Sequence, residues 1–499
     1  MRVRSVVLFA ALGILTSSAG ALAIPVSPAP SRGGIRVEPW PDPPGATGDP
    51  SHFVAGRTLA VDARLGHASM RRSASDETFL FASVTGADAS LAAAPLSLAI
   101  VIDRSGSMAG VRIANAIAAA VLAVDRMRDG DTVTVVSFDT AAKVVVAPTR
   151  TTASSRVEIQ NAIRGIRLGG DTCISCGLEE AMRQLDGAAV ARDRVSRMIL
   201  LSDGEATHGI KDLPGLRAMA ARMRERGLAI STIGVDVSFD EKSMAAIASE
   251  SNGRHYFVAN PSGLPAIFAQ EFDSIAASVA RDAELAIDLG PGVEVEEVFD
   301  RSFRREGTRV VVPFGTFSAR EEKTVLMRVR VPSTREGELP IGALKLTYRD
   351  LVERAEGTCT GSLALVVKSD GTEQRELDPF VAVRLERSRT SQTLTKANVL
   401  FEQGRVDEAR AALTRQHDEL AKTRALALSA SSAPKAKGRG LRDDFAEQDR
   451  ALAEAQSSLA PSAVGGAGAS TPAAAPAATS TAGRASVRNN QSKATDMAF

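Results

Sequence analysis

Residues 96–108 read LSLAIVIDRSGSM, and this stretch decides the fold prediction. It opens with an almost wholly apolar run, as expected of a strand that is covered on both faces. Asp103, Ser105 and Ser107 then place one acid and two hydroxyls at alternating positions. Residues 111–127 follow with the apolar spacing and the alanine content of a helix. A buried strand, a polar loop and a helix in this order predict one unit of a parallel α/β sheet.

Strands and helices continue to alternate over residues 96–278. This alternation predicts a doubly wound, mostly parallel, Rossmann-like sheet. In such sheets, ligands bind where the loops leave the carboxyl ends of the strands. Further strands are expected at 131–139, 143–148, 196–204 and 228–236, and further helices at 156–166, 177–185, 214–227 and 240–253.

The segments on either side of this α/β unit have the composition of β-strands. Residues 52–95 contain alternating and β-forming stretches such as RTLAVDARL and ETFLFASVTG. Residues 279–370 contain short strands separated by Gly, Pro and Asp, a spacing that suggests a β-sandwich. The strands before the α/β unit have no partners of their own. We therefore expect them to complete this sandwich, with the α/β unit inserted between its two parts.

The C-terminal part is predicted to contain helices and then a tail. Residues 378–456 form a helical region, in which Asp378-Pro379 opens the first helix of a hairpin that turns at Gly404. Residues 457–499 include the low-complexity run PSAVGGAGASTPAAAPAATSTAG, and this tail is predicted to be disordered.

The N-terminus has the three parts of a secretory signal peptide. Residues 1–23 contain two arginines, a short apolar stretch and a small-residue site that ends in Ala-Leu-Ala. Residues 24–51 are rich in Pro and Gly and are predicted to be a linker. No later segment is apolar for long enough to cross a membrane. We therefore expect an exported protein that is periplasmic, secreted or held at the cell surface.

The overall charge argues against nucleic acid as a partner. Lys and Arg number 60 and Asp and Glu number 59, so no strong field attracts a polyanion. Aromatic residues make up only 4% of the chain, which leaves few surfaces for stacking bases.

Oxygen side chains follow three of the segments that meet at one edge of the predicted sheet. Asp103, Ser105 and Ser107 leave the first strand, Thr172 lies in a Gly-rich loop before a helix, and Asp203 ends the strand at 196–204. Oxygen ligands suit hard cations such as Mg²⁺, Ca²⁺ or Mn²⁺. The sequence therefore predicts a divalent metal site from these five residues.

These motifs resemble the metal-ion-dependent adhesion site of von Willebrand factor type A domains. The match comprises D-x-S-x-S at 103–107, G-x-T-x-I-x-x-G-L at 170–178 and L-L-S-D-G at 200–204, and the order of strands and helices agrees. The flanking β regions look like those of bacterial exported proteins that carry this domain inside a sandwich. Asp171 departs from the pattern, since many relatives have Gly before the Thr, and we expect it to face solvent.

The resemblance implies a role for each residue. Ser105, Ser107 and Thr172 would bind the metal directly or through water, and Asp103 and Asp203 would act mostly through water. Neutral hydroxyl ligands would leave a position that a partner's Asp or Glu carboxylate fills. The expected function is thus metal-dependent binding of a protein partner, as in adhesion. The alternative is a structural or assembly subunit of an envelope complex, in which the helical region binds partners and the metal only stabilises the fold.

Catalytic interpretations of the same loop are less consistent with the residues present. A phosphotransferase that uses Asp103 would resemble the haloacid-dehalogenase group, which needs a second acid where Ser105 stands. A serine nucleophile lacks the G-x-S-x-G elbow. His208 follows Asp203 closely, but a His in such a loop is more often merely exposed. We therefore do not expect an enzyme.

Cys173 and Cys176 form a C-x-x-C directly after Thr172. Without a second Cys or His pair, this spacing is weak evidence for zinc. A redox dithiol and a pair of buried free thiols remain open. For an exported chain we favour a structural disulfide that stiffens the metal loop. Cys359 is left over and is expected to lie buried in the sandwich.

Overall fold

The computed structural model describes residues 49–73, 76–88, 94–187, 194–203, 205–235, 240–258, 260–370, 376–430, 440–459 and 478–498. All of these residues fall within the unit Val37–Phe499. The predicted signal peptide and nearly all of the predicted linker lie outside the described residues. Among the helices that are described, none is long and apolar enough to cross a membrane.

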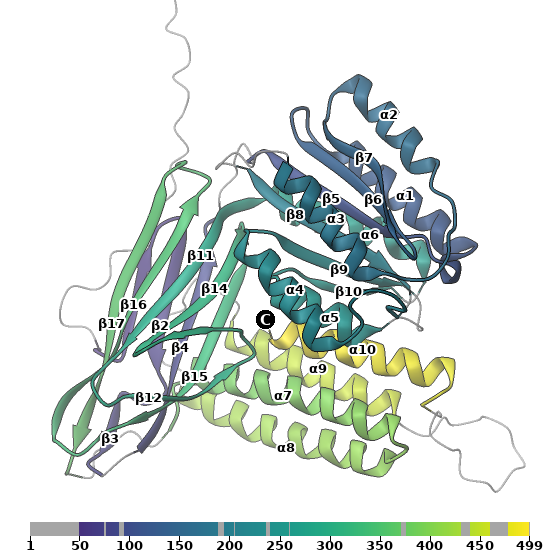
Figure 1. The fold of residues 1–499 in the computed structure, drawn as a ribbon. Helices are drawn as coiled ribbons and strands as arrows, with labels where there is room; N and C mark the ends of the chain where they lie inside the picture. Colours follow the sequence, from purple (N-terminus) through teal and green to yellow (C-terminus); the bar gives the residue numbers. More distant parts are fainter. Residues whose placement is uncertain are drawn as a thin grey trace, which may run out of the picture. The chain divides into compact units, whose positions relative to one another are not determined.

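The α/β part is built on one sheet, whose strands are β5 (Leu96–Asp103), β6 (Thr132–Phe138), β7 (Ala142–Arg150), β8 (Val195–Ser202), β9 (Ala229–Val235) and β10 (His255–Val258). Their order is β10-β9-β8-β5-β6-β7 (Figure 1). All neighbours are parallel except β6 and β7, which are antiparallel. The prediction of a mostly parallel sheet is confirmed. Because β5 lies between β8 and β6, its carboxyl end adjoins the ends of both.

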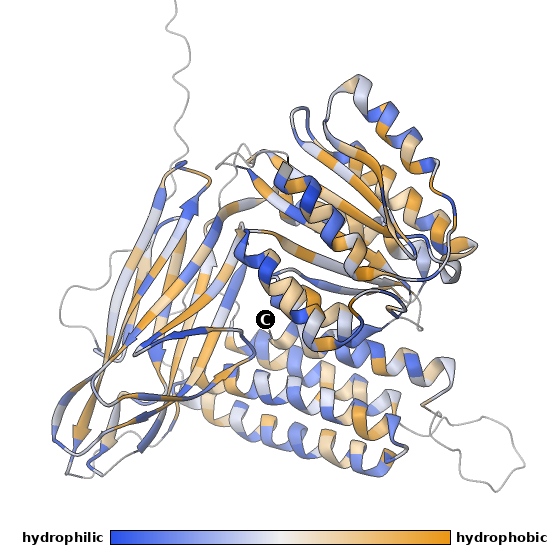
Figure 2. Cartoon of the chain, in the orientation of Figure 1, coloured by the Kyte–Doolittle hydropathy of each residue, from blue (hydrophilic) through white to orange (hydrophobic). Residues whose placement is uncertain are grey.

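Helices cover both faces of this sheet, namely α1 (Val111–Arg126), α2 (Ala153–Arg164), α3 (Ile174–Gly187), α4 (Leu213–Glu225), α5 (Glu241–Glu250) and α6 (Leu264–Ala276). Side chains of β5 alternate between the two faces. Leu98 and Ile100 join a core cluster with α1, α2 and α6, whereas Ala99 and Val101 join one with α3, α4 and α5. Figure 2 shows hydrophobic residues running along these strands, as expected of a sheet that is buried on both faces.

The remaining strands form two antiparallel-rich sheets that share one core. One sheet has the order β1-β2-β4-β15-β12 and the other has the order β13-β14-β11-β16-β17-β3. Buried residues of both sheets, such as Leu80, Met327, Leu285 and Leu346, belong to a single hydrophobic cluster. The strand bounds are β1 His52–Gly56, β2 Leu59–Leu65, β3 Ser69–Arg71, β4 Asp76–Gly86, β11 Ser278–Leu289, β12 Glu294–Phe299, β13 Arg304–Glu306, β14 Arg309–Ser318, β15 Glu322–Val331, β16 Gly337–Asp350 and β17 Glu356–Lys368.

The α/β unit is inserted into this sandwich, as predicted. β4 precedes the unit in sequence, yet it pairs antiparallel with β15, which follows the unit. β3 pairs with β17 in the same way across the insertion, although in parallel orientation. The sandwich is therefore completed only by strands from both sides of the inserted unit.

The C-terminal part contains α7 (Pro379–Glu402), α8 (Val406–Ala430), α9 (Leu441–Ser458) and α10 (Thr481–Ala498). The Asp378 carboxylate caps α7 by accepting hydrogen bonds from the N–H groups of Phe380 and Val381. Gly404 takes a positive φ of 76° in the turn to α8, a conformation that glycine adopts without strain. The predicted hairpin is present, and Figure 1 shows α7, α8 and α9 as neighbouring helices.

The prediction of a disordered tail is wrong for residues 481–498, which form α10. Its buried residues recur at intervals of four and three, which is the spacing of one helix face: Gly483, Val487, Asn490, Ala494 and Met497. Most of them are small or polar, so the sequence gives only a weak apolar signal. Residues 460–477 of the predicted tail lie outside the described residues.

Polar contacts to α7 hold this helix in place. The Asn398 amide donates to the Val487 carbonyl at 3.0 Å, and the Ser391 hydroxyl donates to the Ala494 carbonyl at 2.7 Å. Arg384 donates to the Met497 carbonyl at 3.0 Å, near the helix C-terminus, where positive charge is favourable. Specific hydrogen bonds therefore add to the packing of Val487, Ala494 and Met497 in holding α10 on α7.

We predict that Val487→Asp detaches α10 from α7, because it places a carboxylate on the buried face of the helix. The expected loss is about 2–3 kcal/mol for this packing. It should appear as a lower melting temperature and as faster amide hydrogen exchange throughout 481–498. Asn489→Asp is the control, since it adds the same charge on the exposed side of the same helix. Equal effects of the two changes would contradict the packing of α10.

Candidate metal centre

The first loop of the site is set by Asp103, the last residue of β5. Its Oδ1 accepts a hydrogen bond from the Ser105 N–H at 2.8 Å, and its Oδ2 accepts one from the Ser202 hydroxyl at 2.5 Å. These bonds turn the chain into the short 3-10 helix Gly106–Met108 and join the end of β5 to the end of β8. Asp103 is 0% exposed, so its carboxylate is held rigidly inside this edge of the sheet.

Ser105, Ser107 and Asp203 continue the same hydrogen-bonded chain. The two serine hydroxyls lie 3.0 Å apart, and the Ser107 hydroxyl donates to Asp203 Oδ1 at 2.7 Å. Arg112 donates to Asp203 Oδ2 at 3.0 Å and to the Ser107 carbonyl at 2.6 Å. Four of the five predicted residues, including Asp103, thus lie in one connected cluster.

Backbone hydrogen bonds fasten the Gly-rich loop to the first loop. The Gly169 N–H donates to the Arg104 carbonyl at 2.7 Å, and the Gly106 N–H donates to the Gly170 carbonyl at 3.0 Å. Gly169 also passes so close to Asp139 that a Cβ there would lie 1.9 Å from Asp139 Oδ2. Only glycine fits at this position, which explains part of the Gly-rich character of the loop.

Thr172 is held at this edge through its backbone. Its N–H donates to the Thr207 hydroxyl at 2.9 Å, and its carbonyl accepts from the N–H groups of Thr207 and His208 at 2.8 and 3.1 Å. Thr172 is only 5% exposed, its hydroxyl oxygen is not fully buried, and no described residue hydrogen-bonds this hydroxyl. A hydroxyl that is open to solvent and has no protein partner is available to a bound group.

Sequence reasoning missed Asp139, Arg104 and Arg112. Asp139 follows β6 just as Asp103 ends β5, and this repeated strand-end acid was a usable signal. Its Oδ2 pairs with Arg104 at 2.7 Å and accepts from Gly170 N–H at 3.3 Å. The sequence contains no comparable signal for Arg104 and Arg112, because the carboxylate that each contacts lies on a distant segment of the chain.

The two carboxylates of the cluster are held where negative charge is unfavourable. Burial raises the pKa of Asp103 to about 6, and the nearby charge of Asp203 adds to this rise. Burial also raises the pKa of Asp203, although hydrogen bonds and the charge of Arg112 act in the opposite direction. A cation at this point would favour the ionised form of both acids.

The donor set fits a hard cation. Within the described residues, no three His, Cys, Asp or Glu side chains group together as a metal site. A cation at this edge must therefore rely on hydroxyl oxygens together with the carboxylates. The candidate ligands are Asp103, Ser105, Ser107, Thr172 and Asp203.

Cys173 and Cys176 form a disulfide at the start of α3, with their Cα atoms 5.3 Å apart. The bond packs against Gly209, in the loop that follows Asp203. Gly209 has a φ of 70°, and a Cβ added to it would lie 2.6 Å from Cys173 Sγ. The disulfide therefore supports the Thr172 loop and the loop after β8 at the same time.

Charged side chains lie on the solvent side of these loops. Asp171 is 61% exposed and lies 3.5 Å from His208, which is itself 47% exposed. Glu205 is also exposed. Asp171 thus faces solvent, and His208 pairs with a surface carboxylate rather than with the serine hydroxyls.

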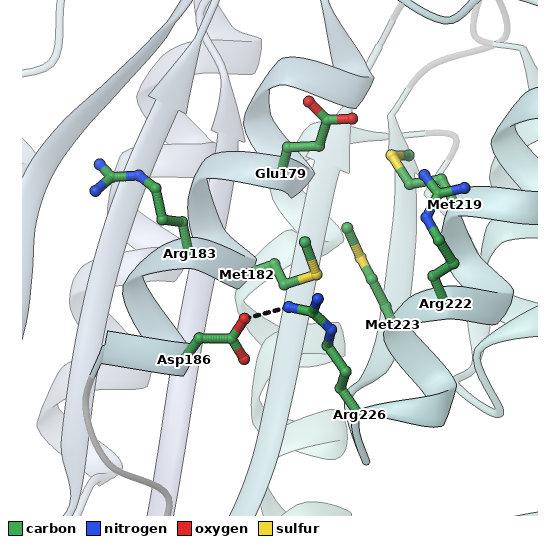
Figure 3. Close-up of a pocket in the computed structure, with 8 residues that line it drawn as sticks. All are labelled: Glu179, Met182, Arg183, Asp186, Met219, Arg222, Met223 and Arg226. Atoms are coloured by element: carbon green, nitrogen blue, oxygen red, sulfur yellow. Dashed lines mark hydrogen bonds and ion pairs between the residues drawn. The ribbon is translucent and has the colours of Figure 1, made fainter.

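A cavity of about 350 Å³ lies between α3 and α4 (Figure 3). Met182, Met219 and Met223 form its apolar part, and Arg226 pairs with Asp186 beside it. None of the predicted metal ligands lines this cavity, so it is separate from the candidate metal centre.

We predict that Gly209→Ala destabilises the protein, because the positive φ is strained for alanine and the added Cβ meets both Ser175 Oγ, at 2.3 Å, and Cys173 Sγ, at 2.6 Å. Gly307→Ala is a matched control, since Gly307 has a similar φ of 66° but has no atom within 4 Å of an added Cβ. Backbone strain alone costs about 1 kcal/mol. The free energy of unfolding should therefore fall by that amount in the control and by clearly more in Gly209→Ala. Thermal unfolding of both variants measures the difference. Equal melting temperatures would show that Gly209 does not pack on Ser175 and the disulfide as described.

Comparison with known proteins identifies the α/β unit. Residues 97–270 match the family model of the von Willebrand factor type A domain. The Synechocystis protein sll0103 is 25% identical over 304 residues, which cover 59% of this chain and 70% of the relative.

Two solved structures share the fold over a larger part of the chain. A von Willebrand factor type A protein from Catenulispora acidiphila aligns with a TM-score of 0.63 at 20% identity and covers 80% of this chain and 98% of its own. The ArnB paralog VWA2 from Sulfolobus acidocaldarius aligns with a TM-score of 0.53 at 17% identity, over 79% of this chain and 98% of its own. At these identities the likeness concerns the fold alone. Together with the strand order and the position of the loops, the match shows that residues 97–270 are a von Willebrand factor type A domain carried within a longer chain.

Proposed function

We propose that this edge of the sheet binds a divalent cation, Mg²⁺, Ca²⁺ or Mn²⁺, and through it captures a carboxylate of a protein partner. The observation that carries the proposal is the connected cluster of Asp103, Ser105, Ser107 and Asp203 at the ends of β5 and β8. Thr172 adds a hydroxyl that is not fully buried and has no partner among the described residues.

The arrangement suggests different roles for hydroxyls and carboxylates. Ser105, Ser107 and Thr172 would hold the cation directly or through water. Asp103 and Asp203 would act mostly through water and by orienting the hydroxyls that they already contact. A bound cation would supply a positive charge that these mostly neutral ligands neutralise only in part.

The exposure of Ser107 supports the binding of a group from a partner molecule. Ser107 and Gly106 are exposed, whereas Asp103 and Ser105 are buried beneath them. The cation would therefore be held from below and left accessible from solvent. A carboxylate is the natural partner group, because it is a hard oxygen ligand that supplies the missing negative charge.

We further propose that the protein is exported and is not an enzyme. The N-terminal sequence has the parts of a signal peptide, and a disulfide is typical of proteins in oxidising compartments. The hydroxyls of Ser105 and Ser107 engage each other and Asp203 rather than a histidine base. Among the described residues, no serine hydroxyl is thus paired with a histidine at this edge.

A second function is favoured by Arg112. Its guanidinium already lies 3.0 Å from Asp203 and neutralises part of the charge of the cluster. The loops therefore have an internal cation that helps to hold them together. This contact favours a structural or assembly subunit, in which a metal only adds stability and the helical region binds partners.

We predict that Thr172→Val weakens Mg²⁺ binding by about tenfold or more and leaves the metal-free melting temperature nearly unchanged. Valine keeps the shape of the side chain and removes a hydroxyl that no described residue uses. Isothermal calorimetry and thermal unfolding measure the two quantities. Thr207→Val is the control, because its hydroxyl supports the Thr172 backbone and its loss should cost about 1 kcal/mol of stability. Unchanged Mg²⁺ affinity in Thr172→Val would remove Thr172 from the ligand set.

We predict that partner capture requires the metal. In a crosslinking pull-down from envelope fractions, the parent should retain its partner in Mg²⁺ and lose it in EDTA, and Asp203→Ala should lose it in both. Asp171→Asn is the control, since it removes an exposed acid beside the site and should still bind. Retention of the partner by Asp203→Ala or in EDTA, together with a lower melting temperature, would favour the structural subunit instead.

A further inference from the structure

We propose that the Cys173–Cys176 disulfide is a thiol–disulfide exchange site, and that its reduction by a dithiol loosens the loops of the metal site and weakens cation binding. The part that concerns the cation rests on the proposed function. The part that concerns the loops stands on the contacts of the disulfide itself.

The disulfide lies against both loops that flank it. Cys173 directly follows Thr172, and its N–H donates to the Asp139 carbonyl at 2.7 Å, which fixes it to the end of β6. On its other side lies Gly209, where an added Cβ would meet Cys173 Sγ at 2.6 Å and Cys176 Sγ at 3.6 Å. The backbone of the loop after Asp203 is thus packed against the sulfur atoms.

Hydrogen bonds tie that loop to the same short segment. The Ile210 N–H donates to the Ser175 hydroxyl at 2.9 Å, and Ser175 lies between the two cysteines in sequence. The N–H groups of Thr207 and His208 both donate to the Thr172 carbonyl. A displacement of the cysteines would therefore move Thr172 and residues 205–210 together.

Reduction would force such a displacement. Two separate thiols need more space than one disulfide, since unbonded heavy atoms keep roughly 3.5–4 Å apart. Gly209 leaves little free space on its side of the sulfurs, and Cys173 is fully buried on the other. The loop at 205–210 is the part that can yield, because its residues are largely exposed.

The two cysteines differ in their exposure to solvent, and this difference determines which sulfur a reductant attacks. Cys173 is 0% exposed, whereas Cys176 is partly exposed. The thiolate of a dithiol reductant would attack Cys176 Sγ, form a mixed disulfide with it and release Cys173 as a thiolate, which then takes up a proton. The second thiol of the reductant, as its thiolate, then attacks the reductant sulfur of the mixed disulfide. This step releases Cys176. The reductant leaves as a disulfide and has supplied both electrons.

Cys359 is not a resolving partner for this exchange. It lies on β17 of the sandwich as a buried free cysteine, and burial raises the pKa of its thiol to about 11. Its replacement by alanine therefore gives a background in which every reactive thiol comes from the C-x-x-C pair.

The experiment uses the full chain with Cys359→Ala, oxidised or treated with dithiothreitol under native conditions. Iodoacetamide labelling and mass spectrometry should find two labelled cysteines in the reduced protein and none in the oxidised one. Hydrogen exchange at residues 205–210 should be faster after reduction, and calorimetry should show Mg²⁺ binding about tenfold weaker, as for the loss of a supporting contact around a metal ligand. In the variant that also carries Cys176→Ser, dithiothreitol should change neither quantity.

The outcomes separate this inference from the proposed function. A disulfide that resists dithiothreitol in the folded protein overturns the inference. So does reduction that leaves both the exchange of residues 205–210 and the Mg²⁺ affinity unchanged. An absence of Mg²⁺ binding in both redox states would instead overturn the proposed function, and hydrogen exchange would still decide whether the disulfide holds the loop.

Discussion

The buried carboxylate of Asp103 is the fixed point on which the site depends. It ends the central strand β5 in a place where water does not reach it, which is unfavourable for a charge unless hydrogen bonds compensate. The Ser105 N–H and the Ser202 hydroxyl provide that compensation. Because one donor lies on the loop after β5 and the other lies at the end of β8, the same carboxylate sets the distance between two strand ends. Asp203 directly follows Ser202, so the same hydrogen bond also fixes the position of Asp203 at the end of β8.

The same edge of the sheet uses strand-end acids in two ways. Asp139 after β6 is paired with Arg104 and with backbone N–H groups, so its charge is met within the protein. Asp103 and Asp203 instead border a set of hydroxyls, and only Asp203 has an arginine, Arg112, in contact. The difference in neighbours explains why the first acid fits a structural role and the other two fit a cation site.

Much of the fold could be predicted from the sequence, because its strands are continuous apolar runs and its helices have clear periodicity. The insertion also followed from simple reasoning, since strands such as β4 had no partners nearby in sequence. The helix α10 was missed because its buried face uses Gly483, Asn490 and Ala494, which give little apolar signal. Asn490 and the Ala494 carbonyl hydrogen-bond to α7, and only the folded chain reveals these contacts. The five candidate ligands of the site were proposed from residue type and resemblance. The ion pairs of Arg104 and Arg112 were not predicted, because the carboxylate that each contacts is brought near only by the folding of the chain.

The insertion itself keeps the site available. The chain enters the α/β sheet at Leu96, the amino end of β5, and the candidate site lies at the carboxyl end of the same strand. An eight-residue strand separates these two ends by roughly 25 Å. The return strand β11 also contacts the amino ends, since Arg281 donates to the Arg194 carbonyl just before β8. The connections to the sandwich therefore lie at the edge opposite to Asp103 and do not cover the hydroxyl-rich loops.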